Sequence, residues 1–213
     1  MEIWPSIYIV RDSYSNKRHT TLEKLILTSL LFVWMAQMPN FLSINSTTSF
    51  SNGDPEIIWS TARRLNWDDF KAQPNGQTLT GAVTHSTIKV MPEANKWTGR
   101  VTVVVQAVFA CNKSWAREKA KESDYLLNHE QRHFDIAELY ARKIRQALAE
   151  ERITIKNYKE VRATIIQPLF REYVKFDEEY DHQTVHGLNK ETQSVWNNRI
   201  DDQLEDMSLY LND

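Results

Sequence analysis

The sequence predicts an α+β fold in which a small β-hairpin or sheet packs against one long helix and two further helices. Two stretches, 79–91 and 100–110, are rich in β-branched residues, and a turn-forming segment lies between them. A third stretch, 115–151, carries apolar residues at intervals of three or four, which is the period of a helix with one buried face. The chain has 213 residues, 41% of them hydrophobic, which is enough for one such domain with a real core.

The two predicted strands should pair as a hairpin, with the turn at 92–99. In the second strand alternate residues form one apolar face: Val101, Val103, Val105, Ala107 and Phe109. Val104 and Val108, on the opposite face, are apolar as well, so we expect burial on both sides of this strand. Aromatic residues upstream of the hairpin are expected to anchor the core: Trp59, Trp67 and Phe70.

A long helix is predicted after the second strand. Ser114 has a side chain suited to cap its N-terminus, and the helical pattern runs from Trp115 to about Glu151. Arg132 is expected on its outward, charged face. The stripe expected to face the core comprises Leu126, His129, His133, Ala137, Tyr140, Ile144 and Leu148.

Two further helices are predicted downstream. The first opens at Asn157, which forms a capping-box pattern with Glu160, and Pro168 should kink this helix or end it locally. The last is amphipathic, and its inward stripe comprises Gln193, Trp196, Ile200 and Leu204.

The long helix contains the motif His-Glu-x-x-His, formed by His129, Glu130 and His133. Residues four apart on a helix point the same way, so the two imidazoles can bind one zinc ion. Glu130 is then placed to accept a proton from metal-bound water, which is the chemistry of a zinc peptidase. Three polar groups on an ordinary core helix would each need a hydrogen-bond partner, whereas one metal ion satisfies both rings.

A catalytic zinc ion commonly has a third protein ligand. Asp135 and Glu138 lie on the same helix but point away from the histidine face. The segment 180–187 is the best source, because it brings two histidines, an aspartate and a tyrosine to one helix end. A polar helix terminus with capping side chains is the alternative interpretation of this segment. The candidate ligands are His85, His182, His186, Asp181 and the acidic run 177–179.

The N-terminal part resembles an export signal more than a folded domain. Basic residues at 17–19 precede an apolar run at 25–36, which is the layout of a secretory signal and is short for a membrane span of about 20 residues. An N-terminal anchor and a buried core helix are the alternatives. We therefore divide the chain into a signal or anchor segment with a polar linker, 1–50, and a metallopeptidase domain, 55–213.

The composition narrows the range of partners. A net charge of −2 gives no reason to expect nucleic acid or an anionic membrane surface as a partner, so a membrane contact is expected only through an N-terminal anchor. Cys111 is the single cysteine; no intrachain disulfide is possible, and we expect a buried thiol. The sequence does not define an oligomeric state.

Two blocks of sequence carry a family resemblance: 127–138, and 180–187 followed by Gln193 and Trp196. Ser114-Trp115 and Trp67-x-Asp69-Phe70 fit as well. Over about residues 57–200 the sequence resembles a family of bacterial secreted proteins described as predicted zinc-dependent proteases, long known only as a domain of unknown function.

The resemblance implies a zincin-like fold. It also implies that His129 and His133 are zinc ligands, that Glu130 is the catalytic base and that His186 is the third ligand. Arg132 stands where this pattern would have a small residue.

The resulting hypothesis is a secreted or cell-envelope zinc metallopeptidase that acts on a peptide or protein substrate, with Glu130 as general base. Tyr180 or His182 would supply a second donor to the oxyanion, and Asp181 would orient a ligand imidazole. An extended peptide would bind along a strand edge of the hairpin. The alternatives are a metal-stabilised envelope binding protein without turnover, and an amidase that acts on cell-wall peptides.

Overall fold

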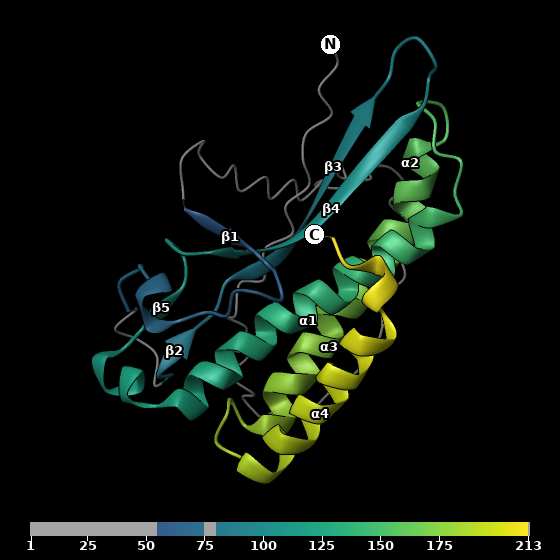
Figure 1. The fold of residues 1–213 in the computed structure, drawn as a ribbon. Coiled ribbons are helices and arrows are strands. Elements are labelled where there is room, and N and C mark those ends of the chain that lie inside the picture. Colours follow the sequence, from purple (N-terminus) through teal and green to yellow (C-terminus); the bar gives the residue numbers. More distant parts are fainter. Residues whose placement is uncertain (1–54, 75–79, 213) are drawn as a thin grey trace, which may run out of the picture.

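The computed structural model of this protein describes residues 55–74 and 80–212 (Figure 1). The predicted signal or anchor segment within residues 1–50 lies outside these ranges, as does Leu79, where the first strand was expected to begin.

The main sheet is antiparallel and has three strands in the order β1-β4-β3. β3 and β4 form the predicted hairpin, which is therefore confirmed. Its turn is shorter than expected, because β3 continues through Pro92 to Ala94 and only six residues, 95–100, separate the strands. Gly99 has a φ of +68°, a left-handed conformation that glycine adopts without a steric penalty. The strands are β1 (Glu56–Ile58), β3 (Ser86–Ala94) and β4 (Val101–Ala110).

A second, two-stranded sheet pairs β2 (Ala82–Val83) with β5 (Trp115–Ala116). The expectation that Ser114 caps a helix starting at Trp115 is therefore wrong. The Ser114 hydroxyl accepts a hydrogen bond from the backbone N–H of His85 and donates one to the carbonyl of Ala110. Tertiary pairing with β2 thus overrides the local helical pattern at this point.

The long helix α1 (Asp124–Ala149) begins after a short 3-10 turn, η2 (Glu118–Glu122). Its N-cap is Ser123, whose side chain accepts a hydrogen bond from the N–H of Leu126. The hydroxyl satisfies one of the N–H groups that the first helical turn leaves without a partner.

The C-terminal part is helical, as predicted, but its first helix is interrupted. Pro168 lies in the first turn of α3, directly after a π-helical turn that accommodates the expected break. Asn157 does not form the expected capping box; its side chain accepts hydrogen bonds from the backbone N–H and the hydroxyl of Thr154. The elements are α2 (Tyr158–Val161), η3 (Arg162–Ile166), α3 (Gln167–Thr184), α4 (Lys190–Asp206) and η4 (Ser208–Tyr210).

Helix α1 is the centre of the molecule. It lies between the hairpin on one side and α3 and α4 on the other, and it contacts all four elements (Figure 1). The polar residues in its middle are therefore buried on every face, and they pair with one another or with neighbouring elements: Gln131, Arg132, Asp135, Glu138 and Arg142.

The prediction that Arg132 faces outward is wrong. The residue is 6% exposed, and its guanidinium binds Asp135 of α1 and Asp201 of α4. The apolar pattern predicts one buried face and one solvent-exposed face for this helix. In the structure α4 covers the face that was expected to be exposed, so Arg132 is buried.

Several core predictions are confirmed. Trp59, Phe70, Phe109 and Cys111 are buried in one cluster, and Cys111 is a free thiol. Val108 is buried as well, so β4 is covered on both faces near its end. Within residues 55–74 and 80–212, no helix has the length and apolar character needed to cross a bilayer.

Shortening Ile144 to alanine should lower the free energy of unfolding by about 2–5 kcal/mol, because this fully buried side chain lies where α1 packs into the core. Ile155→Ala is the matched control, since that side chain is exposed. Urea denaturation of the full chain measures both. Equal losses in the two variants would contradict the central position of α1.

Candidate metal centre

The first half of α1 presents two histidines on one face. His129 and His133 are both buried, and their ring centroids lie 5.0 Å apart with the rings nearly perpendicular. This follows from their spacing of four residues, which corresponds to about one helical turn. As predicted, the two imidazoles share the inward stripe.

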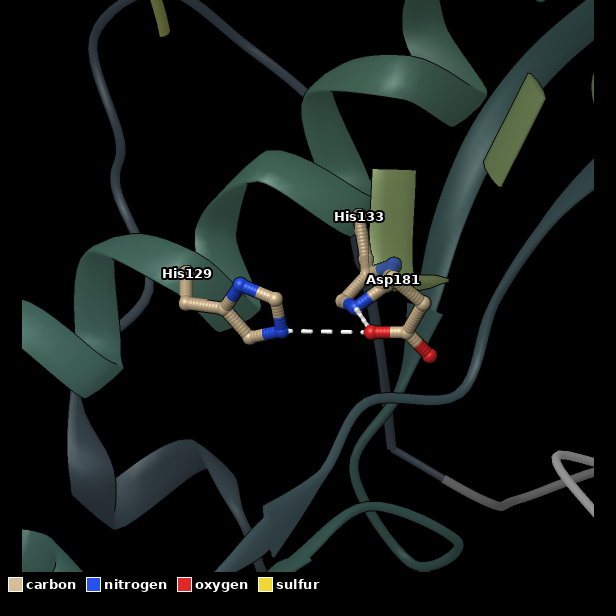
Figure 2. A group of neighbouring side chains, drawn as sticks. All are labelled: His129, His133 and Asp181. Carbon is tan, nitrogen blue, oxygen red and sulfur yellow. Dashed lines mark ion pairs between the residues drawn. The ribbon is translucent and has the colours of Figure 1, made fainter. Parts of the chain in front are cut away.

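Asp181, in the last turn of α3, closes on both rings. Its Oδ1 atom lies 3.3 Å from Nε2 of His129 and 3.2 Å from Nε2 of His133 (Figure 2). The three donor atoms all lie within 4.8 Å of one another, which is close enough to ligate one cation. The group of His129, His133 and Asp181 could therefore hold a divalent metal ion. The sequence had included Asp181 among the candidate ligands and favoured an orienting role for it; in the structure its carboxylate lies with the two imidazoles.

The other candidate ligands lie outside this group of three. The side chain of His186 is 65% exposed, and its Nδ1 atom lies 3.3 Å from Oδ2 of Asp181, next to the donor group. His182 is exposed on α3. The backbone N–H of His85 binds Ser114. The structure thus brings the expected third ligand, His186, to the rim of the site and places Asp181 inside it.

Asp177, one turn before Asp181 on α3, holds His133 from behind. Its Oδ1 atom lies 2.6 Å from Nδ1 of His133, and both side chains are buried. Burial lowers the pKa of His133, but the carboxylates of Asp177 and Asp181 outweigh burial and raise this pKa to about 10. Without a metal ion the ring is therefore an imidazolium, and it has to release a proton before Nε2 can bind a metal ion.

The carboxyl group of Asp181 is the counterpart of this charge. Burial raises its pKa, but the charge of His133 and the hydrogen bonds of the surrounding imidazoles outweigh burial and hold the pKa well below its usual range. The side chain of Asp181 is therefore anionic at any physiological pH.

Tyr180 is fully buried, and its hydroxyl lies behind His129. The oxygen is 2.8 Å from Nδ1 of His129 and accepts a hydrogen bond from Nε2 of Gln193. Burial raises the pKa of Tyr180, the hydrogen bond from Gln193 lowers it, and the charges of Glu130 and Asp181 raise it, so the phenol stays neutral. This position differs from the expected catalytic role as an oxyanion donor, because the hydroxyl contacts the back of a histidine ring.

Asp177 and Gln193 were not expected to be partners of the two histidines. In the sequence, Asp177 stands out only as one residue of an acidic run, and Gln193 as part of an amphipathic stripe and of the family resemblance. The signal that could have found Asp177 is its spacing of four residues before Asp181, which places both carboxylates on one face of α3.

A left-handed turn after α3 closes the site. Val185, His186 and Gly187 have φ values of +53°, +53° and +79°. Positive φ is unfavourable for a β-branched residue such as Val185, and strain of this kind is often found at functional sites. A Cβ atom on Gly187 would lie 3.0 Å from Cγ of His129, so any larger residue would press on the ring, and the positive φ favours glycine as well.

Glu130 is buried beside the donor group. Its backbone carbonyl accepts a hydrogen bond from the hydroxyl of Thr84, in the segment between β2 and β3. The charge of its carboxylate contributes to the raised pKa of Tyr180.

A cavity of about 180 Å³ lies on a different face of α1. Gln131 and Asp135 line it, and each is two residues on from a donor histidine, or about 200° around the helix. Asp135 accepts hydrogen bonds from the Trp59 indole and from Gln131, so its carboxylate is already satisfied. We therefore assign the cavity no part in the metal centre.

The fold and site together define a class of protein: an α+β domain whose central helix carries a His-Glu-x-x-His motif and whose next long helix supplies a carboxylate to it. A family model described as "Bacterial protein of unknown function (DUF922)" matches residues 41–187, and the chain belongs to this family. No curated protein and no solved structure matches the chain.

Replacing Gly187 by alanine should disturb His129 directly. Gly99→Ala is the matched control, because Gly99 also has a positive φ but a Cβ atom there would contact nothing within 4 Å. The left-handed backbone should cost each variant about 1–2 kcal/mol of stability. Only Gly187→Ala should also shift the NMR resonances of the His129 ring. Unshifted His129 resonances in Gly187→Ala would contradict the close contact.

Proposed function

We propose that this protein is a zinc-dependent metallopeptidase of the His-Glu-x-x-His type. The observation that carries the proposal is the approach of Asp181 Oδ1 to within 3.3 Å of Nε2 of both motif histidines. Two imidazoles and one carboxylate are a donor set found in catalytic zinc sites, which leave a further position for water or substrate.

The surroundings of the donors support a metal role. The Nδ1 atoms of His129 and His133 both contact side chains behind them, so each Nε2 atom points to the shared centre. Hydrogen-bonded partners behind metal-binding histidines are a regular feature of zinc sites. Bound there, a zinc ion would lower the pKa of a water molecule to near 7 and polarise a substrate carbonyl.

Glu130 is the proposed general base. Its carboxylate would accept a proton from the attacking water and pass it to the amine that leaves. Tyr180 and Gln193 would keep the His129 ring in place, and Asp177 would keep that of His133 in place. We therefore assign Tyr180 a positioning role in the proposed reaction.

β3 is the proposed docking strand for an extended peptide. It lies at an edge of the three-stranded sheet, and the hydroxyl of its first residue, Ser86, donates a hydrogen bond to the carbonyl of His133. The strand thus starts beside the donor group, and an open edge can pair with an added strand. Hydrolysis of an amide in a cell-wall peptide would use the same catalytic groups, and only the substrate would differ.

A metal-stabilised binding protein without turnover is the second candidate. The low exposure of the donor side chains favours it: 3% for His129, 8% for His133 and 14% for Asp181. A structural metal needs no access for substrate, whereas a catalytic one does. For either function we propose export to the cell envelope or the medium, on the basis of the signal-like segment in residues 1–50.

Glu130→Gln should separate these two functions. In a peptidase, the variant should bind zinc as the wild type does and lose at least 100-fold in peptide hydrolysis, because the amide cannot accept the proton. Zinc content by atomic emission and turnover of a quenched peptide library measure the two properties. A wild-type protein that binds zinc stoichiometrically and cleaves no peptide would favour the binding protein instead.

Asp181→Asn and His186→Ala should identify the third ligand. We expect Asp181→Asn to lose most of its zinc, because the anionic donor closest to both histidines is removed. His186→Ala should retain zinc, as should the control His182→Ala on the exposed side of α3. Loss of zinc from His186→Ala alone would make His186 the ligand and return Asp181 to an orienting role.

A further inference from the structure

We propose that a chain of hydrogen bonds from Arg132 through Asn197 to Gln193 fixes the tautomer of His129, which makes Gln193 of α4 a positioning residue of the metal centre. The positioning role rests on the proposed metal site, whereas the tautomer itself does not. The donor and acceptor of each hydrogen bond can be assigned in turn, because Arg132, at one end, has only donors.

Arg132 defines the direction of the chain. A guanidinium has N–H donors and no acceptor. Its Nε atom donates to Oδ1 of Asn197 at 3.1 Å, so this atom of Asn197 is the carbonyl oxygen. The Asn197 amide nitrogen then donates to Oδ1 of Asn128 at 3.0 Å, which agrees with this assignment.

Gln193 is oriented in turn by Asn197. Because Oδ1 of Asn197 is an acceptor, the Gln193 atom that lies 2.8 Å from it has to be the amide nitrogen, Nε2. The same Nε2 atom donates to the Tyr180 hydroxyl at 2.6 Å. The carbonyl oxygen of Gln193 is therefore the atom that faces His129.

His129 is the end of the chain. Oε1 of Gln193 lies 2.8 Å from Nδ1 of His129 and can only accept, so Nδ1 carries the hydrogen. In the neutral ring the lone pair is then on Nε2, which faces Oδ1 of Asp181 at 3.3 Å. Two acceptors at this distance need a cation between them, and either a proton on Nε2 or a metal ion supplies it.

Two carboxylates hold Arg132, the first residue of this hydrogen-bond chain. The Arg132 guanidinium binds Asp135 on its own helix and both carboxylate oxygens of Asp201 on α4. Gln193, Asn197 and Asp201 are spaced by four residues, so they form one row along α4 that faces α1. All three follow residue 187, where the family match ends. Helix α4 therefore contributes to the site although it supplies none of the three metal donors.

The Nδ1 atom of His133 carries a hydrogen for a simpler reason. Its Nδ1 atom faces the carboxylate of Asp177, which can only accept, at 2.6 Å. One ligand ring is thus held by an anion and the other by a neutral amide. The neutral partner needs the Arg132 chain, because an amide by itself can present either its oxygen or its nitrogen to the ring.

The test is the tautomer of His129 in the metal-free, full-length protein, measured by ¹⁵N NMR, together with zinc affinity by chelator competition. The wild type should show hydrogen on Nδ1. Gln193→Met, which has a similar volume and no amide, should show a mixture of tautomers and bind zinc about 10–100-fold more weakly. Gln193→Glu, which keeps an acceptor toward Nδ1, should retain the wild-type tautomer.

Asn197→Leu provides an independent second variant, with exposed Asn198→Leu as its neighbour control. Only Asn197→Leu should allow the Gln193 amide to turn over and thus change the His129 tautomer. No hydrogen on Nδ1 in the wild type, or an unchanged tautomer in both Gln193→Met and Asn197→Leu, would overturn the proposal. A wild type that shows the expected tautomer but binds no zinc would instead refute the proposed metal site and still support the hydrogen-bond chain from Arg132 to His129.

Discussion

The burial of residues 129–142 of α1 on all sides is the constraint on which the rest of this structure depends. A helical segment enclosed by a sheet and two other helices cannot leave a charged side chain to water, and an unpaired buried charge costs several kcal/mol. Three charged residues in and after the motif are therefore held by partners: Asp135 by Trp59 and Gln131, Arg132 by Asp201, and Glu138 by Arg142. The rings of His129 and His133 are subject to the same requirement.

The two histidines differ from these pairs. Each Nδ1 atom has its own partner, whereas both Nε2 atoms face a single carboxylate oxygen, Oδ1 of Asp181. A purely structural polar cluster would pair each donor with its own acceptor. Here three donor atoms converge on one point, with an anionic aspartate and a histidine that is charged without metal. A divalent cation would satisfy all three, which is why we favour a metal centre over a buried salt bridge.

Helices α3 and α4 have different tasks around this centre. α3 supplies Asp181 as a donor and Asp177 as a support, one turn apart on the same face. α4 supplies no donor but orients a donor through Gln193. The left-handed turn between them brings Gly187 against the His129 ring, so the connection is itself part of the site. The matched family segment ends at this turn, yet the site extends into the next helix.

The sequence by itself determined the local features: the hairpin, the long helix with both histidines on one stripe, and the segment 180–187 as the source of the remaining polar groups. These depend on periodicity and spacing, which are properties of neighbouring residues. The prediction from sequence failed where contacts with a distant element decide the position of a residue. Ser114 binds the backbone of His85 beside the β2–β5 pair and caps no helix, and Arg132 is covered by α4.

Only the tertiary structure decided which polar group closes on the histidines. Asp181 and His186 are five residues apart: Asp181 still belongs to α3 and faces the histidines, whereas His186 lies in the left-handed turn after α3 and is exposed. Likewise, the partners behind the rings come from residues 44 and 64 positions further along the chain. No local pattern encodes contacts of that length, because they depend on how α3 and α4 pack against α1.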